Sequence, residues 1–377
     1  MHIPSLPVGF RPFHRNAFLN YQFNRVHALG WVPGDELSRH AARVRRPRDC
    51  VEVFSQLAET AGLEGRLLPA VGYARLAEFF TRQRSPEKRD AYMRFRNAID
   101  AAFPLQRIEI PYRNASLFAY EMKPAGQCRG DILFFGGFDS LIEEFLGIWE
   151  RIMEAGYRVI AFDGPGQGGS ITLSNLRMEH DWEAPVTAVL DHFDIDDVTL
   201  IGFSMGGYWA TRAAAYENRV VRLVAWPPVY DWMFQLPTFF RSWVPAALKF
   251  RTAMNLLFRL RMRLFPILDH AIRQALYLSG GKDPVDGIHF LLGMNHKHIG
   301  AERVKADVLM LSGETDMFQP PKLAEYQKTA LTNARSITTK MFRASEQAGH
   351  HCQMGNLDLA VDAVIGWLRE HDQEYED

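Results

Sequence analysis

Ser204 stands between two glycines in the stretch LIGFSMGGYW, directly after an apolar run and directly before a segment with helical spacing. A serine at such a place can cap the helix that follows, because its hydroxyl accepts a hydrogen bond from a free backbone N–H. It can also be a nucleophile, since G-x-S-x-G between a strand and a helix forms a sharp turn that exposes the hydroxyl. That turn needs small residues at Gly202 and Gly206, where side chains would collide with backbone. The sequence predicts that Ser204 is a nucleophile, with a helix cap as the alternative.

A serine hydroxyl needs a base to accept its proton and an acid to orient that base. On a turn of this kind the acid and the histidine follow the serine in that order along the chain. Asp316 fits the acid, because the pattern Ser-Gly-x-x-Asp places it at the tip of the loop after the strand-like run ADVLMLSG. Glu314 is the second candidate for the acid. Asp316 could instead cap a helix that starts near Pro320.

Two adjacent histidines, His350 and His351, are the candidates for the base. Neighbouring residues in a loop usually point in different directions, so only one of them is expected to reach Ser204. Spacing alone does not choose between them. The other histidines, including the three at positions 289, 296 and 298, are expected to be surface residues or to make local hydrogen bonds.

Acyl transfer also needs hydrogen-bond donors for the negative oxygen that develops on the attacked carbonyl. The backbone N–H of Met205, which follows the serine, is the first predicted donor. The second is the N–H of Phe138, because the Gly-Gly turn in ILFFGGFDS lets backbone approach a substrate closely. The glycine-rich segment DGPGQGGS at 163–170 lacks the lysine and the spacing of a phosphate loop, so a structural turn is expected there.

The segments around these residues alternate between short apolar runs and helix-length stretches from about residue 105 onward. Such alternation predicts an α/β fold with a mainly parallel sheet and helices on both faces. Helical spacing dominates residues 49–103, and the alternation lapses again in an aromatic and basic block that is expected to be a helical lid. The predicted divisions are an N-terminal helical region at 1–104, a first core part at 105–229, the lid at 230–303 and a second core part at 304–377.

The composition is that of an ordinary globular protein, with 377 residues, 47% hydrophobic and 23% charged. A formal net charge of −1 gives no overall field for nucleic acid or an anionic membrane, so the expected partner is a small-molecule substrate. Neither a metal nor an organic cofactor is expected, and the oligomeric state stays open, with a homodimer as one alternative. Three widely separated cysteines and an N-terminus interrupted by proline favour a reducing, cytoplasmic location. An arginine cluster is expected to be a solvated face: Arg39, Arg43, Arg45, Arg46 and Arg48.

With the serine turn, acid loop and histidine loop in this order, the chain resembles the α/β-hydrolases over roughly residues 105 to 370. The stretches GGFDSLIEE, AFDGPGQGGS, GFSMGGYWA and HHCQMGN resemble, more narrowly, the group of 2,6-dihydroxypseudooxynicotine hydrolase and the fungal polyketide-shortening hydrolases. In that group the catalytic histidine directly precedes Cys-Gln, which assigns the base to His351. The group includes enzymes that cleave a carbon–carbon bond beside a ketone, as well as esterases and acyl transferases. It also implies an acid at the lid entrance, matched by Asp231, for which a helix cap is the alternative role.

These observations predict a serine hydrolase that forms an acyl-enzyme. The many Phe, Trp and Met residues between 226 and 265 suggest an apolar or aromatic substrate. The resemblance favours cleavage of a carbon–carbon bond next to a carbonyl in a ketone or polyketide-like compound. An esterase or thioesterase, or an acyltransferase or cyclase, would use the same residues, and a non-catalytic ligand receptor is the alternative outside enzymes.

Overall fold

The predicted strands form one sheet in the computed structural model, which describes residues 5–373. Within those residues the sheet has eight strands in the order β1-β2-β4-β3-β5-β6-β7-β8. The pairs β1–β2 and β2–β4 are antiparallel, and every other pair is parallel, so the predicted mainly parallel sheet is confirmed. The strands are β1 (Ile108–Tyr112), β2 (Ala115–Met122), β3 (Asp131–Phe135), β4 (Arg158–Asp163), β5 (Val198–Phe203), β6 (Val220–Trp226), β7 (Asp307–Gly313) and β8 (Ser336–Phe342).

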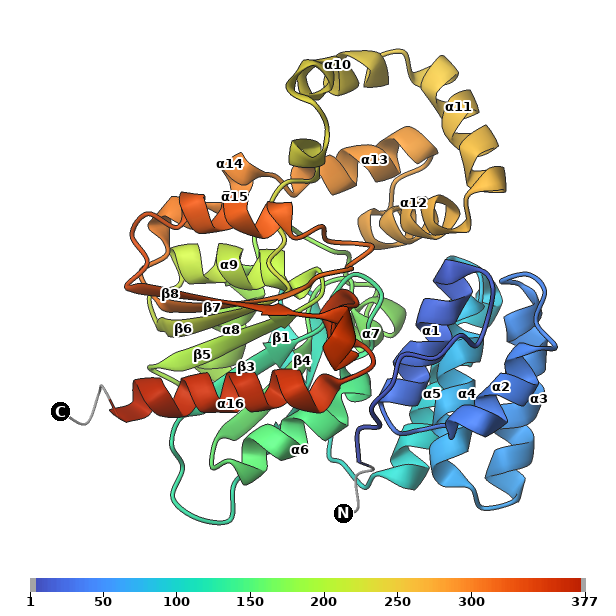
Figure 1. Ribbon diagram of the computed structural model, residues 1–377, viewed down its shortest axis with the longest axis horizontal. Coiled ribbons are helices and arrows are strands. Elements are labelled where there is room, and N and C mark those ends of the chain that lie inside the picture. The colour runs from blue at the N-terminus through green and yellow to red at the C-terminus, as the bar shows by residue number, and fades with distance from the viewer. Residues whose placement is uncertain (1–4, 374–377) are drawn as a thin grey trace.

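Helices cover both faces of the sheet because successive strand residues point to opposite sides (Figure 1). Phe134 packs into one hydrophobic core together with α6, α16 and the N-terminal helices. Its neighbour Phe135 packs into a second core together with α8 and α9. The helices that follow strands are α6 (Leu146–Glu154), α7 (Gly168–Thr172), α8 (Glu183–Phe193), α9 (Gly206–Tyr216), α15 (Lys322–Ala330) and α16 (Leu357–Gln373).

The N-terminal region is helical, as predicted, and the helices begin earlier than the spacing at 49–103 indicates. They are α1 (Ala17–Ala28), α2 (Gly34–Ala41), α3 (Asp49–Leu63), α4 (Leu67–Phe80) and α5 (Pro86–Ala102). The arginines of the 39–48 cluster are exposed on this region, which fits a solvated face. The cores of these helices and of one sheet face are continuous, so this region is packed against the sheet rather than tethered to it.

Between β6 and β7 the chain leaves the sheet and forms further helices on the side where the parallel strands end (Figure 1). They are the 3-10 turn η2 (Trp232–Gln235), α10 (Thr238–Leu248), α11 (Arg251–Leu264), α12 (Pro266–Ser279), α13 (Pro284–Gly293) and α14 (His296–Ile299). Helix α12 carries residues that contact the N-terminal region, the sheet domain and the site described next.

Candidate active site

Ser204 occupies a tight turn between the end of β5 and the start of α9. Its φ of +59° lies in the left-handed region, which a residue with a side chain rarely adopts. A Cβ on Gly202 would lie 2.0 Å from the carbonyl oxygen of Gly206, so only glycine fits there. A Cβ on Gly137 would lie 2.6 Å from the Cβ of Ser204, which shows how closely the loop after β3 approaches the serine. The backbone therefore presents the Ser204 hydroxyl at the carboxyl end of the sheet.

A continuous chain of hydrogen bonds runs from Ser204 through His351 to Asp316. Ser204 Oγ lies 2.8 Å from His351 Nε2, and His351 Nδ1 lies 2.7 Å from Asp316 Oδ2. The other carboxylate oxygen, Oδ1, accepts the N–H groups of Phe318 and Gln319, both at 2.8 Å. This arrangement allows the imidazole to take the serine proton while the carboxylate stabilises the resulting imidazolium.

The charge of Asp316 also sets the protonation behaviour of His351. The side chains of both residues are buried, His351 at 6% exposure and Asp316 at 0%. Burial by itself would lower the pKa of His351, but the adjacent Asp316 carboxylate raises it well above its ordinary value. His351 is therefore a stronger proton acceptor than a free imidazole.

The two alternative residues that the sequence offers lie elsewhere. The ring of His350 stacks on Phe10, with ring centroids 3.6 Å apart. Glu314 is exposed, and its carboxylate accepts the N–H of Ala344. Of the paired candidates, the structure brings His351 and Asp316 to Ser204.

The residues after His351 anchor its loop. Cys352 and Gln353 both have positive φ values, +52° and +53°, so the backbone turns sharply here. Gln353 Oε1 accepts a hydrogen bond of 2.6 Å from Nε1 of Trp226 at the end of β6, and the Tyr21 hydroxyl of α1 donates to the His351 carbonyl at 3.3 Å. The Cys-Gln pair following the histidine is thus part of its support, a role that sequence analysis did not assign.

The predicted oxyanion donors, the N–H groups of Phe138 and Met205, lie on the two loops that meet at Ser204. Both residues line the same cavity as Ser204. Within residues 5–373 neither N–H has a hydrogen-bond acceptor, so both are available to a bound oxygen. The geometry is compatible with two donors facing a reacting carbonyl.

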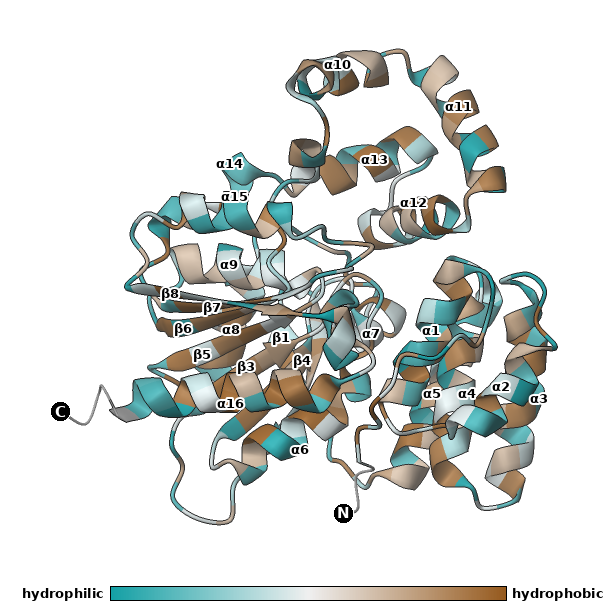
Figure 2. Ribbon diagram, in the orientation of Figure 1, coloured by the Kyte–Doolittle hydropathy of each residue, from teal (hydrophilic) through white to brown (hydrophobic). Residues whose placement is uncertain are grey.

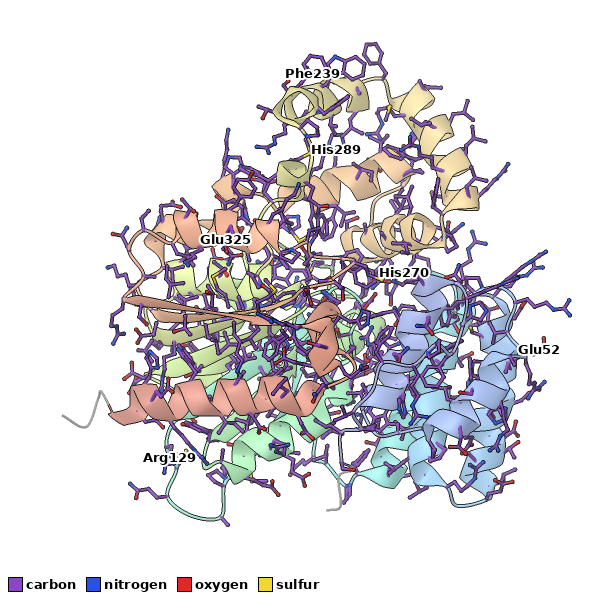
Figure 3. The ribbon with its side chains drawn as sticks, viewed as in Figure 1. Glu52, Arg129, Phe239, His270, His289 and Glu325 are labelled. Atoms are coloured by element: carbon purple, nitrogen blue, oxygen red, sulfur yellow. The ribbon has the colours of Figure 1, made fainter. Side chains whose placement is uncertain are left out.

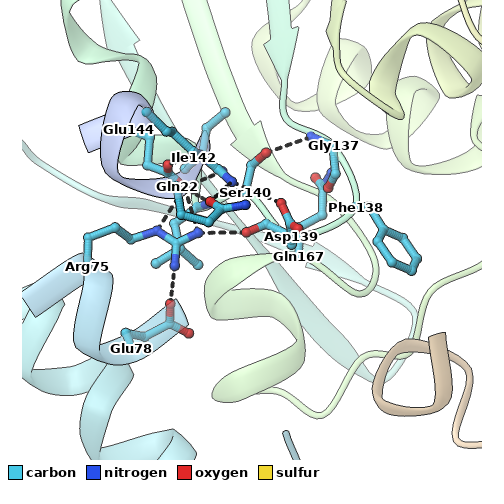
Figure 4. A network of polar contacts seen from close by, with 12 residues as sticks. Gln22, Arg75, Glu78, Gly137, Phe138, Asp139, Ser140, Ile142, Glu144 and Gln167 are labelled. Atoms are coloured by element: carbon cyan, nitrogen blue, oxygen red, sulfur yellow. Dashed lines mark hydrogen bonds and ion pairs between the residues drawn. The ribbon is translucent and has the colours of Figure 1, made fainter. Parts of the chain in front are cut away.

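Side chains from three other parts of the chain hold the loop that carries Phe138, and Figure 4 labels two of them, Arg75 and Gln167. The side chains come from α4, from the turn at 163–170 and from the lid helix α12, and each donates to a loop carbonyl. They are Gln167, to Gly136 (2.7 Å) and Gly137 (3.1 Å), Gln274, to Phe138 (2.9 Å), and Arg75, to Asp139 (2.6 Å). The segment DGPGQGGS is accordingly a turn whose glutamine fixes this loop.

A cavity of about 490 Å³ opens at Ser204, and its walls are mainly apolar. Apolar and aromatic side chains from α1, the lid and the loops after β3, β5 and β7 line it: Phe18, Tyr21, Phe138, Met205, Ile267, Leu268, Leu291 and Phe318. Arg25 and His270, which sequence analysis did not single out, also reach it. Both lie on helices, Arg25 on α1 and His270 on α12, and no motif in the sequence connects either of them with Ser204.

Few residues of the aromatic stretch 226–265 line this cavity. From that stretch only Trp232 and Gln235 line the lid side of the cavity. Phe239, Trp243 and Phe250 are instead 71%, 62% and 72% exposed. Figure 2 shows hydrophobic (tan to brown) segments along α10 and α11, which lie far from the sheet. Composition identified the apolar residues but not the direction in which the helices present them.

Asp231 does not line the cavity. Its Oδ1 caps η2 by accepting the N–H of Met233 at 2.8 Å, and its Oδ2 lies 2.7 Å from Nδ1 of His296. The position therefore matches the helix-cap alternative, with His296 as an additional partner. His298 hydrogen-bonds Tyr208 and Asp181, also outside the cavity.

In the part of the chain that the structure describes, no helix is long and apolar enough to cross a membrane. No three of its His, Cys, Asp or Glu side chains are arranged to hold a metal ion.

Comparisons with known proteins agree with this fold. The family profile described as "alpha/beta hydrolase fold" matches residues 132–357. "Hydrolyase poxO" of Penicillium oxalicum is 25% identical over 296 residues, which cover 70% of this chain and 69% of poxO. The "20-hydroxy-prefusarin hydrolase FUS2" of Gibberella moniliformis is 32% identical over 52% of this chain and 57% of its own. The crystal structure of a 2,6-dihydroxy-pseudo-oxynicotine hydrolase superposes with a TM-score of 0.62 at 20% identity, covering 92% of this chain and 94% of its own.

Proposed function

The chain belongs to the α/β-hydrolase family, and on that premise we propose that it is a serine hydrolase that works through an acyl-enzyme. One observation carries this proposal: the hydrogen-bonded series Ser204–His351–Asp316, with distances of 2.8 and 2.7 Å, at the edge of an apolar cavity. The relatives named above are hydrolases, which supports the same conclusion.

The reaction follows from these positions. Ser204 Oγ attacks the substrate carbonyl carbon while its proton passes to Nε2 of His351, and the N–H groups of Phe138 and Met205 bind the oxyanion. When the bond to the leaving group breaks, that group takes the proton from His351 and the acyl group stays on Ser204. Water then attacks the ester carbonyl and gives a proton to His351, which returns it to Ser204 as the acid is released.

We further propose that the substrate is an apolar or aromatic ketone of polyketide type, cleaved at a carbon–carbon bond next to the carbonyl. The apolar walls of the cavity support such a substrate. The name of the Gibberella relative, which acts on 20-hydroxy-prefusarin, supports a large natural product as the substrate class. Hydrolysis of an ester or thioester needs the same serine, histidine and oxyanion donors, so the two bond types must be separated by experiment.

A labelling experiment tests the nucleophile. A fluorophosphonate probe should modify the wild-type protein once, at Ser204, and should not modify Ser204→Ala. The exposed Ser38→Ala on α2 is the matched control and should label like the wild type. Labelling of Ser204→Ala to the wild-type extent would exclude Ser204 as the nucleophile.

Substrate panels then test the bond type. Benzoylacetone, a β-diketone, and p-nitrophenyl butyrate, an activated ester, should both be turned over, and intact mass should detect the corresponding acyl-enzyme. Cleavage of the ester alone would leave the protein an esterase. Addition of a small alcohol or amine, followed by product mass, distinguishes hydrolysis from acyl transfer, and absence of any turnover would favour a ligand receptor.

A further inference from the structure

One wall of the cavity carries a cluster of ionisable groups that the reaction above does not use. It consists of Arg25 on α1, Asp139 on the loop after β3 and His270 on the lid helix α12 (Figure 3 labels His270). Three parts of the chain thus meet at this wall.

The cluster is held in one arrangement by short contacts. His270 Nε2 lies 2.9 Å from Asp139 Oδ2, and Arg25 Nη1 donates to Asp139 Oδ1 at 3.0 Å. Arg25 is held in turn by an ion pair with Glu144, in which Arg25 Nε lies 2.7 Å from Glu144 Oε2. The His270 ring stacks on Phe79 with centroids 4.7 Å apart, which leaves it little freedom to rotate.

Asp139 is a carboxylate in this setting. Burial by itself would raise its pKa, but the hydrogen bond to His270 and the charge of Arg25 hold it well below its ordinary value. The carboxylate accepts the N–H at Nε2 of His270, so Nδ1 is the nitrogen left for a ligand. Among residues 5–373 no group hydrogen-bonds this Nδ1.

The cluster adjoins the predicted oxyanion donors. Asp139 follows Phe138 directly in the chain, and consecutive Cα atoms are about 3.8 Å apart. Phe138, Asp139 and His270 line the same cavity, so a substrate whose carbonyl oxygen lies on the Phe138 N–H can extend along the wall that carries His270. An imidazole nitrogen there can donate to a ketone oxygen when protonated, or accept from an enol hydroxyl when not.

We propose that His270, oriented by Asp139, is a specificity residue whose Nδ1 hydrogen-bonds a second oxygen of the substrate, so that the substrate class is a β-diketone or its enol. This inference rests on the proposed carbon–carbon cleavage. When that bond breaks, its electron pair passes onto the second oxygen as an enolate, which strengthens a hydrogen bond from protonated Nδ1. The proton that the fragment finally receives is the one held by His351, and His270 keeps its own. An ester, whose leaving oxygen takes the charge itself, has no need of this contact.

Two substitutions of His270 separate recognition from a purely structural link between lid and core. In His270→Gln the amide takes the place of Nε2, so the contact with Asp139 is kept and Nδ1 is lost. In His270→Asn the shorter amide takes the place of Nδ1, and the contact with Asp139 is lost. Recognition predicts that Asn preserves substrate selectivity better than Gln, whereas a structural link predicts the reverse.

Binding can be measured without turnover in full-length Ser204→Ala. Calorimetric titration compares benzoylacetone with butyrophenone, which has the same carbon skeleton without the second oxygen. We expect benzoylacetone to bind about 3- to 10-fold more tightly, as for one added hydrogen bond. His270→Gln in this background should remove the preference, His270→Asn should retain part of it, and the exposed lid variant His289→Gln should retain all of it. Thermal melting of each variant checks folding.

Several outcomes would overturn the inference: no detectable binding of benzoylacetone, equal binding of both ketones, equal weakening of both by His270→Gln, or a preference kept by Gln and lost by Asn. A kinetic measurement distinguishes this failure from that of the proposed function. If the wild type does not cleave benzoylacetone but the binding preference and its loss in His270→Gln are observed, the bond type is wrong and the recognition stands. If cleavage occurs, His270→Gln should lower kcat/KM for benzoylacetone about 10- to 150-fold more than for p-nitrophenyl butyrate, as for a hydrogen bond to a charged oxygen.

Discussion

Substitution of Asp316 by asparagine is expected to inactivate the protein through the tautomer of His351. Oδ1 of Asp316 accepts two backbone N–H groups, from Phe318 and Gln319, so the amide oxygen must occupy that position in Asp316→Asn. The amide NH₂ then faces Nδ1 of His351, which can only accept from it. The imidazole proton is forced onto Nε2, where it points at Ser204 instead of a lone pair, and the serine proton has no acceptor.

The expected loss is large and comes without unfolding. A wrong histidine tautomer in a Ser–His–Asp arrangement lowers kcat by about 10⁴-fold, or about 5.5 kcal/mol of transition-state stabilisation. Because both backbone hydrogen bonds to Oδ1 are kept, the melting temperature of Asp316→Asn should stay close to that of the wild type. Asp316→Ala leaves those two N–H groups without their acceptor and should lower the free energy of unfolding by about 1–3 kcal/mol for each group that stays unpaired.

Steady-state hydrolysis of p-nitrophenyl butyrate, together with thermal melting, tests this reasoning. Glu314→Gln is the matched control, since it removes an exposed carboxylate two residues away and should leave kcat/KM within about twofold, as for a surface change. Retention of more than a tenth of the activity by Asp316→Asn would refute the tautomer argument. Equal losses in Asp316→Asn and Glu314→Gln would show that the acid has been misassigned.

Three further outcomes are expected. His351→Ala should lower kcat by several orders of magnitude. His350→Ala removes only the ring stacked on Phe10 and should lower kcat less than about tenfold. The reverse order in the same ester assay would exchange the roles of the two histidines. Asp316 raises the pKa of His351, and only the neutral ring accepts the serine proton, so activity should fall as pH drops through a midpoint above about 6.5. Asp316→Ala should shift that midpoint downward. A profile of kcat/KM against pH with its acid limb below 6 would contradict this. Asp231→Asn should lower the melting temperature, because the amide NH₂ would face the backbone N–H of His296 at the position of Oδ2. The variant should reduce ester and diketone turnover by the same factor. Selective loss of diketone cleavage would restore Asp231 as the auxiliary acid.

The strands and the candidate residues on their carboxyl ends could be predicted because each signal is local. The apolar runs identify the strands, and each of the three residues lies on the loop after one of the later strands: Ser204 directly after β5, Asp316 after β7 and His351 after β8. In a parallel sheet those ends share one edge, so residues more than a hundred positions apart are expected to meet. The choice of His351 over His350 as the base depended only on a resemblance, because the sequence pattern does not show which of two adjacent residues points toward Ser204.

The cavity walls could not be predicted because their residues depend on tertiary packing. Helix α1 was missed since it is buried almost all round, including the polar residues Gln22, Asn24, Arg25 and His27, and so has no clear apolar face to produce a helical period. The lid shows the opposite case, in which hydrophobic residues are abundant but many face outward. In α1 and in the lid helices alike, contacts with residues distant in sequence determine which face of the helix is buried.

The N-terminal segment is hydrogen-bonded to the histidine loop, and this bears on how the protein is made. Gly9 donates to the carbonyl of Gly355 at 2.6 Å, and Tyr21 donates to that of His351, 330 positions later. At about 5–20 residues per second, a ribosome takes about 15 to 70 s to synthesise the intervening chain. For that time the face of α1 that will meet the loop has no partner, while the sheet strands before it can already pair. The proposed proton relay would therefore be complete only after the histidine loop has left the exit tunnel, and we expect no reaction with substrate from a nascent chain that still lacks this loop.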